Sequence, residues 1–177
     1  RRGQLWHLTR DLGRLGFDTL LLLPSPRQTE LDPASEKKQE NIDAFRRQFA
    51  ERIVKLGDAK LQEGGFKLLL AQGTSAAWAA NLITSEQLPA PDALVLLDGF
   101  FPNQLSNQTL AKQVAQASIP TLDLYQEDGG RWPLLAAEAR QSESRRSHKL
   151  NYRPYALMEL GETPGRIQGW LTHLGWI

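Results

Sequence analysis

The stretch Phe66–Ala80 (F-K-L-L-L-A-Q-G-T-S-A-A-W-A-A) contains the transition that decides the fold. Its first part, Phe66–Ala71, is a short apolar run of the kind that forms a buried strand. Small residues, among them Gly73, follow at once and suit a tight turn. The alanine-rich segment from Ser75 to about Leu82 then favours a helix. The stretch therefore predicts a strand, a tight turn and a helix in immediate succession.

The same alternation of helix and strand extends in both directions along the chain. Short apolar runs predict further strands at residues 17–23, 93–97, 119–125 and 155–160. Amphipathic spacing predicts helices at residues 5–15, 42–56, 109–117, 134–145 and from Thr163 onward. Strands joined by helices run parallel, and continuous apolar strands need cover on both faces. We therefore expect an α/β fold, a doubly wound and mainly parallel sheet with helices on both faces, in a single domain over residues 1–177.

Composition excludes several classes of function. The 177 residues carry a formal net charge of +1, which gives no electrostatic reason to expect nucleic acid as a partner. The chain contains no cysteine, so disulfides and thiolate chemistry are excluded. No apolar run approaches the roughly 20 residues of a membrane-spanning helix. No phosphate-binding loop or dinucleotide fingerprint occurs either. We therefore expect no cofactor, no nucleic acid and no integral membrane segment.

The turn after Ala71 resembles the nucleophile elbow of α/β-hydrolases, a G-x-S-x-G turn between a strand and a helix. In this alignment Ala71 and Gln72 take the first two turn positions, and Gly73 takes the position of the nucleophile. Two later runs follow in the same order as in hydrolases. The run A-L-V-L-L-D-G at residues 93–99 is similar to the next hydrolase strand. The run I-P-T-L-D-L-Y-Q-E-D at residues 119–128 is similar to the strand after that, and it places Asp128 at the position of the triad acid. The resemblance implies a hydrolase-like core.

Two further segments narrow the resemblance. With Y-R-P at residues 152–154 and R-I-Q-G-W-L at 166–171, the chain resembles a bacterial family of uncharacterised, hydrolase-like proteins, many of which carry export signals. The resemblance covers the chain from about Leu5 to its end. It implies a periplasmic or otherwise exported protein, while a cytoplasmic location stays open.

A second alignment of the turn is open. It begins at Gly73 and places Ser75 at the nucleophile position, which moves the turn two residues along the chain and makes Gln72 end the strand. We favour the alignment with Gly73 at that position, because it keeps small residues on both flanks of the turn and keeps the length of the strand ahead of it.

Hydrolysis by a catalytic triad needs a histidine that this sequence does not place correctly. The base must lie within hydrogen-bonding distance of the nucleophile, and hydrolases carry it in the loop after the last strand. That loop is G-E-T-P-G at residues 161–165, and the histidines lie elsewhere, at His7, His148 and His173. We therefore expect a non-catalytic protein that binds a small molecule or a protein partner at the rim around the elbow. The candidate residues there are Gln72, Gly73, Thr74, Ser75, Asp98 and Asp128.

Two alternative functions stay open. One is an active, esterase-like serine hydrolase that uses Ser75, with Asp128 or Asp98 as the acid. The other is an envelope-associated structural or interaction protein without a small-molecule site. Asp98, Asp123 and Asp128 show none of the spacing typical of a metal site, so we expect no metal.

Several other residues have simple structural explanations. The basic group Arg145, Arg146, His148 and Lys149 predicts a solvated surface. For Trp78, Trp132, Trp170 and Trp176, core packing is favoured over a ligand cleft. The run of Asn and Gln at residues 103–108 predicts a polar loop, or alternatively a contact to a sugar or peptide. Asp123 lies within a predicted strand, where hydrogen bonding to a neighbouring loop would satisfy it.

The first predicted strand departs from the hydrolase pattern. In the hydrolase fold an earlier strand lies between the strands that correspond to residues 17–23 and 66–71, and this sequence has no strand before its first helix. We therefore expect either that upstream residues of the natural protein complete the sheet or that the chain closes the gap differently. Direct pairing of residues 17–23 with 66–71 would contradict the alignment of the first third.

Overall fold

The computed structural model describes residues 2–22, 31–35, 39–60 and 65–177. The elements follow one another along the chain as α1 (Arg2–Arg14), α2 (Gln39–Lys60), β1 (Leu68–Gln72), α3 (Thr74–Thr84), β2 (Ala93–Leu97), α4 (Gln104–Gln116), β3 (Thr121–Gln126), α5 (Arg131–Arg146), β4 (Tyr152–Leu157), the 3₁₀ helix η3 (Leu160–Glu162) and α6 (Thr163–His173).

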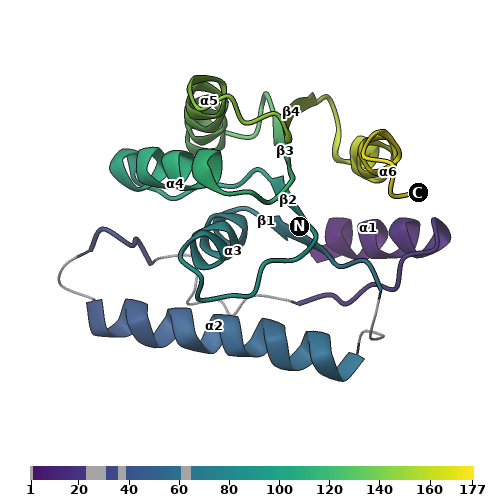
Figure 1. Ribbon diagram of the computed structural model, residues 1–177, viewed down its shortest axis with the longest axis horizontal. Helices are drawn as coiled ribbons and strands as arrows, with labels where there is room; N and C mark the ends of the chain where they lie inside the picture. Colours follow the sequence, from purple (N-terminus) through teal and green to yellow (C-terminus); the bar gives the residue numbers. More distant parts are fainter. Residues whose placement is uncertain (1, 23–30, 36–38, 61–64) are drawn as a thin grey trace.

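The described strands form one parallel sheet in the order β1-β2-β3-β4. Crossovers between parallel strands are right-handed, so helices that join neighbouring strands in this order all lie on one face. Accordingly α3, α4 and α5 cover one face, with α2 packed against α3, while α1 and α6 cover the other (Figure 1). The fold is therefore α/β and doubly wound, as the sequence predicts.

Strand β2 shows why the apolar runs become strands. All five residues of A-L-V-L-L are buried, and they alternate between two cores. Leu94 and Leu96 pack with α2, α3 and α4, whereas Ala93, Val95 and Leu97 pack with α1 and α6. Burial of each leucine contributes roughly 1.5–3 kcal/mol. A run that is apolar at every position is thus stable only as an interior strand with cover on both faces.

The predicted strand at residues 17–23 is wrong over the part that the structure describes. Residues 17–22 form no strand, and Leu23 lies outside the described residues. An extended apolar run becomes a strand only where a neighbour accepts its hydrogen bonds, and β1 pairs with β2 alone among the described strands. The direct pairing that would contradict the hydrolase alignment is therefore not observed in the described segments.

Three predicted boundaries need correction. The last strand is β4 (Tyr152–Leu157), not 155–160; as an edge strand it tolerates Pro154, which lacks a backbone donor. The run of Asn and Gln at 103–108 is not a loop, because Asn103 caps α4 by accepting a hydrogen bond from the Ser106 nitrogen at 3.0 Å. β1 begins at Leu68, not Phe66.

Candidate functional site

The turn between β1 and α3 consists of one residue, Gly73. Its φ of 63° and ψ of −136° place it in a conformation that glycine adopts readily and other residues rarely do. The Gly73 nitrogen donates to the Leu97 carbonyl at 2.9 Å, and the Gly73 carbonyl accepts from the Phe100 nitrogen at 3.4 Å. The apex of the turn is therefore Gly73, held against the carboxyl end of β2, while Ser75 belongs to the first turn of α3.

The space around Gly73 is open. A Cβ atom built on this residue would meet no other atom within 4 Å, whereas one built on Gly99 would lie 3.2 Å from the Cβ of Ala76. Backbone conformation, rather than crowding, thus favours glycine at position 73. Close packing favours it at position 99.

A cavity of about 1360 Å³ lies beside this turn. It is lined by all six residues that the sequence predicts for the rim, namely Gln72, Gly73, Thr74, Ser75, Asp98 and Asp128. The rest of its wall is largely apolar and includes residues of α1, the 17–22 segment, α2 and β1, together with residues that follow β2, β3 and β4. Since the carboxyl ends of parallel strands share one edge of a sheet, the six residues line the same cavity although they lie at or after the ends of three different strands.

The two carboxylates of the rim differ in their surroundings. Asp98 has a positive φ of 48°, and its backbone nitrogen donates to the Leu124 carbonyl at 2.8 Å. Its Oδ1 atom accepts a hydrogen bond from the Gln126 nitrogen, also at 2.8 Å. Asp98 is therefore fixed against β3 and shapes the loop that carries Asp128. Asp128 is exposed in the turn that follows β3.

Residues 24–176 match a family described as "Protein of unknown function (DUF3530)". The chain belongs to the DUF3530 family. No curated protein and no solved structure matched it. The prediction of an uncharacterised family is thereby confirmed. The matched region includes the Gly73 turn, Asp98 and Asp128, so the cavity rim lies in the part of the chain that matches the DUF3530 family.

The histidines of this DUF3530 chain lie away from the cavity. His7, His148 and His173 are all exposed, and none of them lines its wall. No histidine is therefore placed to activate Ser75. The described residues also contain no group of three or more His, Cys, Asp or Glu side chains placed to hold a metal ion. Within the same residues, no helix is both long and apolar enough to cross a membrane.

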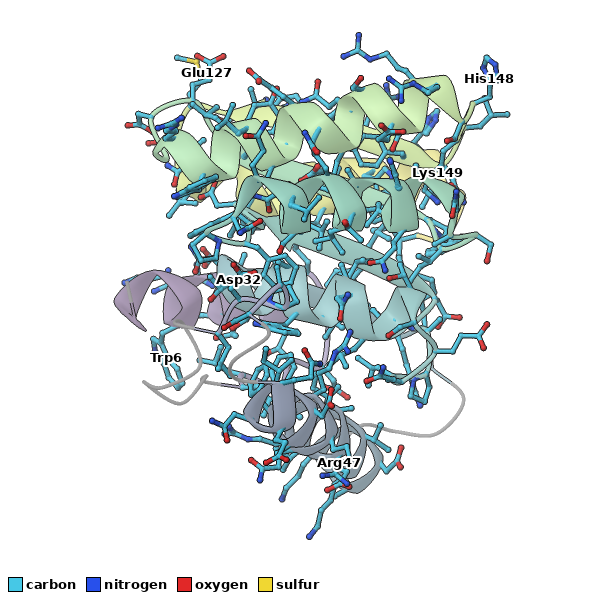
Figure 2. All side chains as sticks on the ribbon, turned by 90° about the vertical axis from the view of Figure 1, so that its left-hand side faces the viewer. Trp6, Asp32, Arg47, Glu127, His148 and Lys149 are labelled. Carbon is cyan, nitrogen blue, oxygen red and sulfur yellow. The ribbon has the colours of Figure 1, made fainter. Side chains whose placement is uncertain are left out.

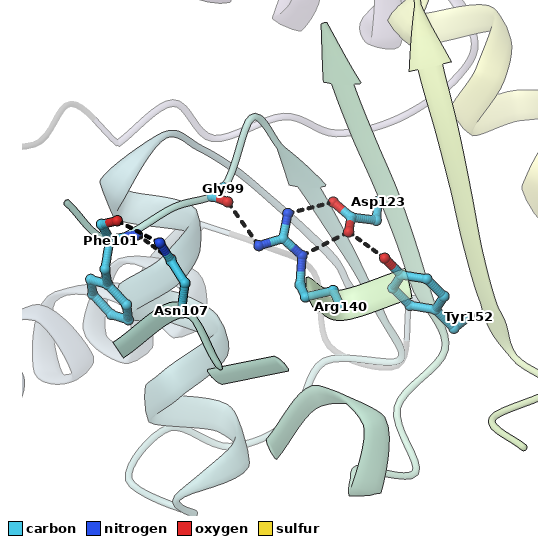
Figure 3. Close-up of polar contacts among 6 residues, drawn as sticks. All are labelled: Gly99, Phe101, Asn107, Asp123, Arg140 and Tyr152. Carbon is cyan, nitrogen blue, oxygen red and sulfur yellow. Dashed lines mark hydrogen bonds and ion pairs between the residues drawn. The ribbon is translucent and has the colours of Figure 1, made fainter. Parts of the chain in front are cut away.

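A buried polar cluster that the sequence does not predict lies behind the rim. Arg140 donates from Nε to Asp123 Oδ2 at 2.7 Å and from Nη2 to Asp123 Oδ1 at 2.9 Å. The Tyr152 hydroxyl donates to the same carboxylate, which lies between the two side chains (Figure 3). Arg140 also donates from Nη1 to the Gly99 carbonyl at 2.8 Å. The cluster therefore joins α5, β3 and β4 to the loop after β2.

Burial and charge set the protonation of this cluster. Burial disfavours the charge of Arg140, but the Asp123 carboxylate and Tyr152 outweigh it and raise the pKa of Arg140. Burial and then the Asp123 carboxylate raise the pKa of Tyr152, so that its hydroxyl stays a neutral donor. The expectation that a loop satisfies Asp123 is wrong, since its partners are side chains. One signal in the sequence could have revealed this partner. The charged residue Arg140 lies one helical turn after the small residues Ala136 and Ala137, on a buried face of the helix.

The other predicted residues have structural roles. Core packing is confirmed for Trp78 and Trp170. It is wrong for Trp176, which lines the cavity and is 37% exposed, and for Trp132, which is partly buried beside Arg131. Arg145, Arg146 and His148 are exposed as predicted, and His148 lies at the opposite end of α5 from Glu127 (Figure 2). Lys149 is instead half-buried and donates to the carbonyls of Ala117 and Ile119.

Asn107 also serves the fold rather than a ligand. It is buried, accepts a hydrogen bond from the Phe101 nitrogen and donates one to the Phe101 carbonyl, both at 2.7 Å (Figure 3). Ser106, next to it, donates to Asp32 at 2.8 Å. The alternative of a sugar or peptide contact at residues 103–108 gains no support from these partners.

Proposed function

We propose that this chain is a non-catalytic, α/β-hydrolase-like domain that binds a small, largely apolar ligand in the cavity beside Gly73. The observation that carries the proposal is Gly73 itself. It occupies the apex of a strand–turn–helix, faces the cavity and has no side chain that could act as a nucleophile. The polar side chains among the six rim residues would orient the ligand beside the Gly73 turn.

The composition of the wall supports a small-molecule ligand. Ligand sites in proteins are concave and mainly apolar, with a few polar groups that fix orientation. Here apolar side chains, chiefly leucine and phenylalanine, form the larger part of the wall, and carboxylates and hydroxyls also line it. The alternative of a structural protein without a small-molecule site is less well supported. Such a protein would be expected to have side chains that fill the space at the rim, whereas a cavity lies there. An exported location remains part of the proposal and rests on the family resemblance.

Binding of the uncharged fluorescent probe N-phenyl-1-naphthylamine tests the proposed site. We expect saturable fluorescence enhancement with the natural protein. Thr74→Trp, which places an indole at the cavity rim, should weaken probe binding at least about tenfold, a change of roughly 1.4 kcal/mol. The matched control is Thr109→Trp, at an exposed position of α4 away from the cavity, which should leave affinity within about twofold. Equal weakening by both variants, or no saturable binding at all, would overturn the proposal.

A fluorophosphonate probe separates this function from the serine hydrolase alternative. Ser75 lines the cavity, but no histidine lies there to take its proton. We therefore expect no labelling of the natural protein and no turnover of ester substrates. Stoichiometric labelling that is lost in Ser75→Ala would instead establish the active hydrolase.

A further inference from the structure

The turn between α5 and β4 holds an apolar residue, Leu150, that is 98% exposed, more than any other large apolar residue that the structure describes. The residues on both sides of Leu150 are fixed. The Lys149 ammonium group donates to two backbone carbonyls in residues 117–119, the connection between α4 and β3. On the other side, Asn151 donates from Nδ2 to the Ser118 carbonyl at 2.8 Å. Leu150 therefore projects into solvent from a turn that is attached to the rest of the fold.

Basic residues flank this turn along the chain. Residues 143–153 contain four Lys or Arg and one acidic residue, so their net charge is +3 with His148 neutral, although the whole chain carries only +1. Arg145, Arg146 and Arg153 are exposed. Cations interact favourably with the carboxyl end of a helix, which accounts for the two arginines of α5. That effect does not explain Arg153, which lies on β4, or the exposed leucine of the turn.

The opposite side of the molecule is acidic. The turn lies at the amino ends of β3 and β4, whereas three exposed carboxylates follow these strands at their carboxyl ends, namely Glu127, Asp128 and Glu159. Figure 2 shows Glu127 and His148 at opposite ends of α5. This half of the molecule is therefore polarised along the strand direction, and a negatively charged surface would attract the end that carries Leu150.

Acidic residues at the amino ends of the strands limit the extent of the basic surface. Glu143 pairs with Arg146 at 2.9 Å, although 70% of the arginine side chain stays exposed. Glu86 and Asp92 precede β2, which β3 separates from β4 in the sheet. The basic surface is thus confined to the turn and to the adjacent parts of α5 and β4.

We propose that this basic turn, which consists of Arg145, Arg146, Leu150 and Arg153, docks reversibly on an anionic phospholipid bilayer. Guanidinium groups match the geometry of phosphate oxygens and would lie at the level of the lipid phosphates. Leu150 would enter the boundary between the head groups and the acyl chains. Three arginines and one leucine provide a weak and reversible attachment, since stable anchoring needs stronger signals.

A bilayer fits this surface better than an acidic protein does. Protein interfaces centre on several apolar or aromatic side chains that pack together. Among residues 143–153, in contrast, Leu150 is the only large apolar side chain in the exposed class. A bilayer accepts a single apolar side chain without a preformed pocket. The inference goes beyond the proposed ligand site, because none of residues 143–153 lines the cavity. The rim beside Gly73 would face away from the bilayer.

Co-sedimentation with lipid vesicles tests the leucine. We expect the natural protein to bind vesicles made of equal parts of phosphatidylglycerol and phosphatidylcholine, to ignore vesicles of phosphatidylcholine alone, and to dissociate as salt is added. Leu150→Ser should weaken binding about tenfold, because it removes the inserted side chain. The matched control is Leu105→Ser, at a 65% exposed position in the first turn of α4, which should bind like the natural protein. No binding of the natural protein, or equal losses in both variants, would overturn the proposal.

The arginines are tested in the same assay. Each basic residue near an anionic surface strengthens binding about fivefold, so Arg145→Gln with Arg153→Gln should weaken it about 20-fold. Arg131→Gln, at the other end of α5, is the control and should have no effect. If the double arginine variant loses binding but Leu150→Ser does not, the turn attracts any polyanion and the proposal is wrong. Naphthylamine binding should be unchanged in all these variants, so the ligand site and the basic turn can fail separately.

Discussion

The two sides of the sheet, called here its β1 end and its β3–β4 end, differ in how completely they are shielded from solvent. At the β3–β4 end, Arg140, Asp123 and Tyr152 satisfy one another in a region where Arg140 and Asp123 have almost no contact with solvent. At the β1 end, a strand whose residues are only partly buried borders a cavity of about 1360 Å³. The Gly99 carbonyl connects them, because it accepts from Arg140 and follows Asp98 of the rim. We infer that the sealed end holds the rim in place and that the open end provides the space for the proposed ligand.

Removal of Arg140 should give the largest loss of stability. Arg140→Met leaves the Asp123 carboxylate buried without its cation, which costs about 3–5 kcal/mol. Urea unfolding measures the free energy. The matched control is Arg166→Met, because Arg166 pairs with Glu162 at a partly exposed site and lies over the Tyr155 ring, so its loss should cost much less than the loss of Arg140. At the open end, Leu70→Ala should cost about 2 kcal/mol or less, since Leu70 is only half-buried.

A double variant distinguishes a charge effect from a packing effect. Arg140→Met with Asp123→Leu removes both buried charges, so it should be more stable than Arg140→Met alone. If the double variant is less stable than the natural protein by the sum of the two single losses, the ion pair is not the reason for the loss caused by Arg140→Met. The sealed end would then depend on side-chain packing instead.

The sequence predicts those parts of the fold that local pattern determines. The β1–α3 turn and the run A-L-V-L-L of β2 were predictable, because both depend on neighbouring residues. The segment 17–22 has an equally apolar pattern but forms no strand, since a strand also needs a partner from elsewhere. The pairing of Asp123 with Arg140, 17 residues later, could not be predicted for the same reason. The rim residues were predictable as a group through parallel topology, whereas the size of the cavity depends on packing that no local pattern encodes.

Gly73→Ser tests whether conformation alone favours glycine at the apex. The added side chain meets open space, but the positive φ is unfavourable for serine, so we expect a loss of roughly 1–2 kcal/mol in urea unfolding. Gly165→Ser is the control, because Gly165 also has open space around it and lies in α6 without a positive φ. Gly165→Ser should not lower the free energy of unfolding. Gly73→Ser should also gain no ester hydrolysis, since no histidine lines the cavity. Turnover by this variant would contradict the proposal that the rim is non-catalytic.

Lys149 should give the smallest effect, and only as a dependence on pH. Its ammonium group lies at the amino ends of β3 and β4, where burial lowers its pKa from 10.5 to about 8. Between these two values the unfolded chain binds more protons than the folded one, so stability rises as the pH increases through this window. A neutral amine still has two N–H groups for the carbonyls of Ala117 and Ile119, so deprotonation removes the penalty and keeps both contacts.

The size of this effect is limited because Lys149 is half-exposed and solvent screens its charge. From pH 7 to pH 10, the natural protein should gain about 1 kcal/mol more stability than Lys149→Met. The matched control is Lys112→Met, at an exposed position of α4, which should follow the natural profile. Parallel profiles for the natural protein and Lys149→Met would mean that the ammonium group is fully solvated. The amino ends of β3 and β4 would then be less tightly sealed than the Arg140 cluster, and the contrast between the two ends of the sheet would rest on that cluster alone.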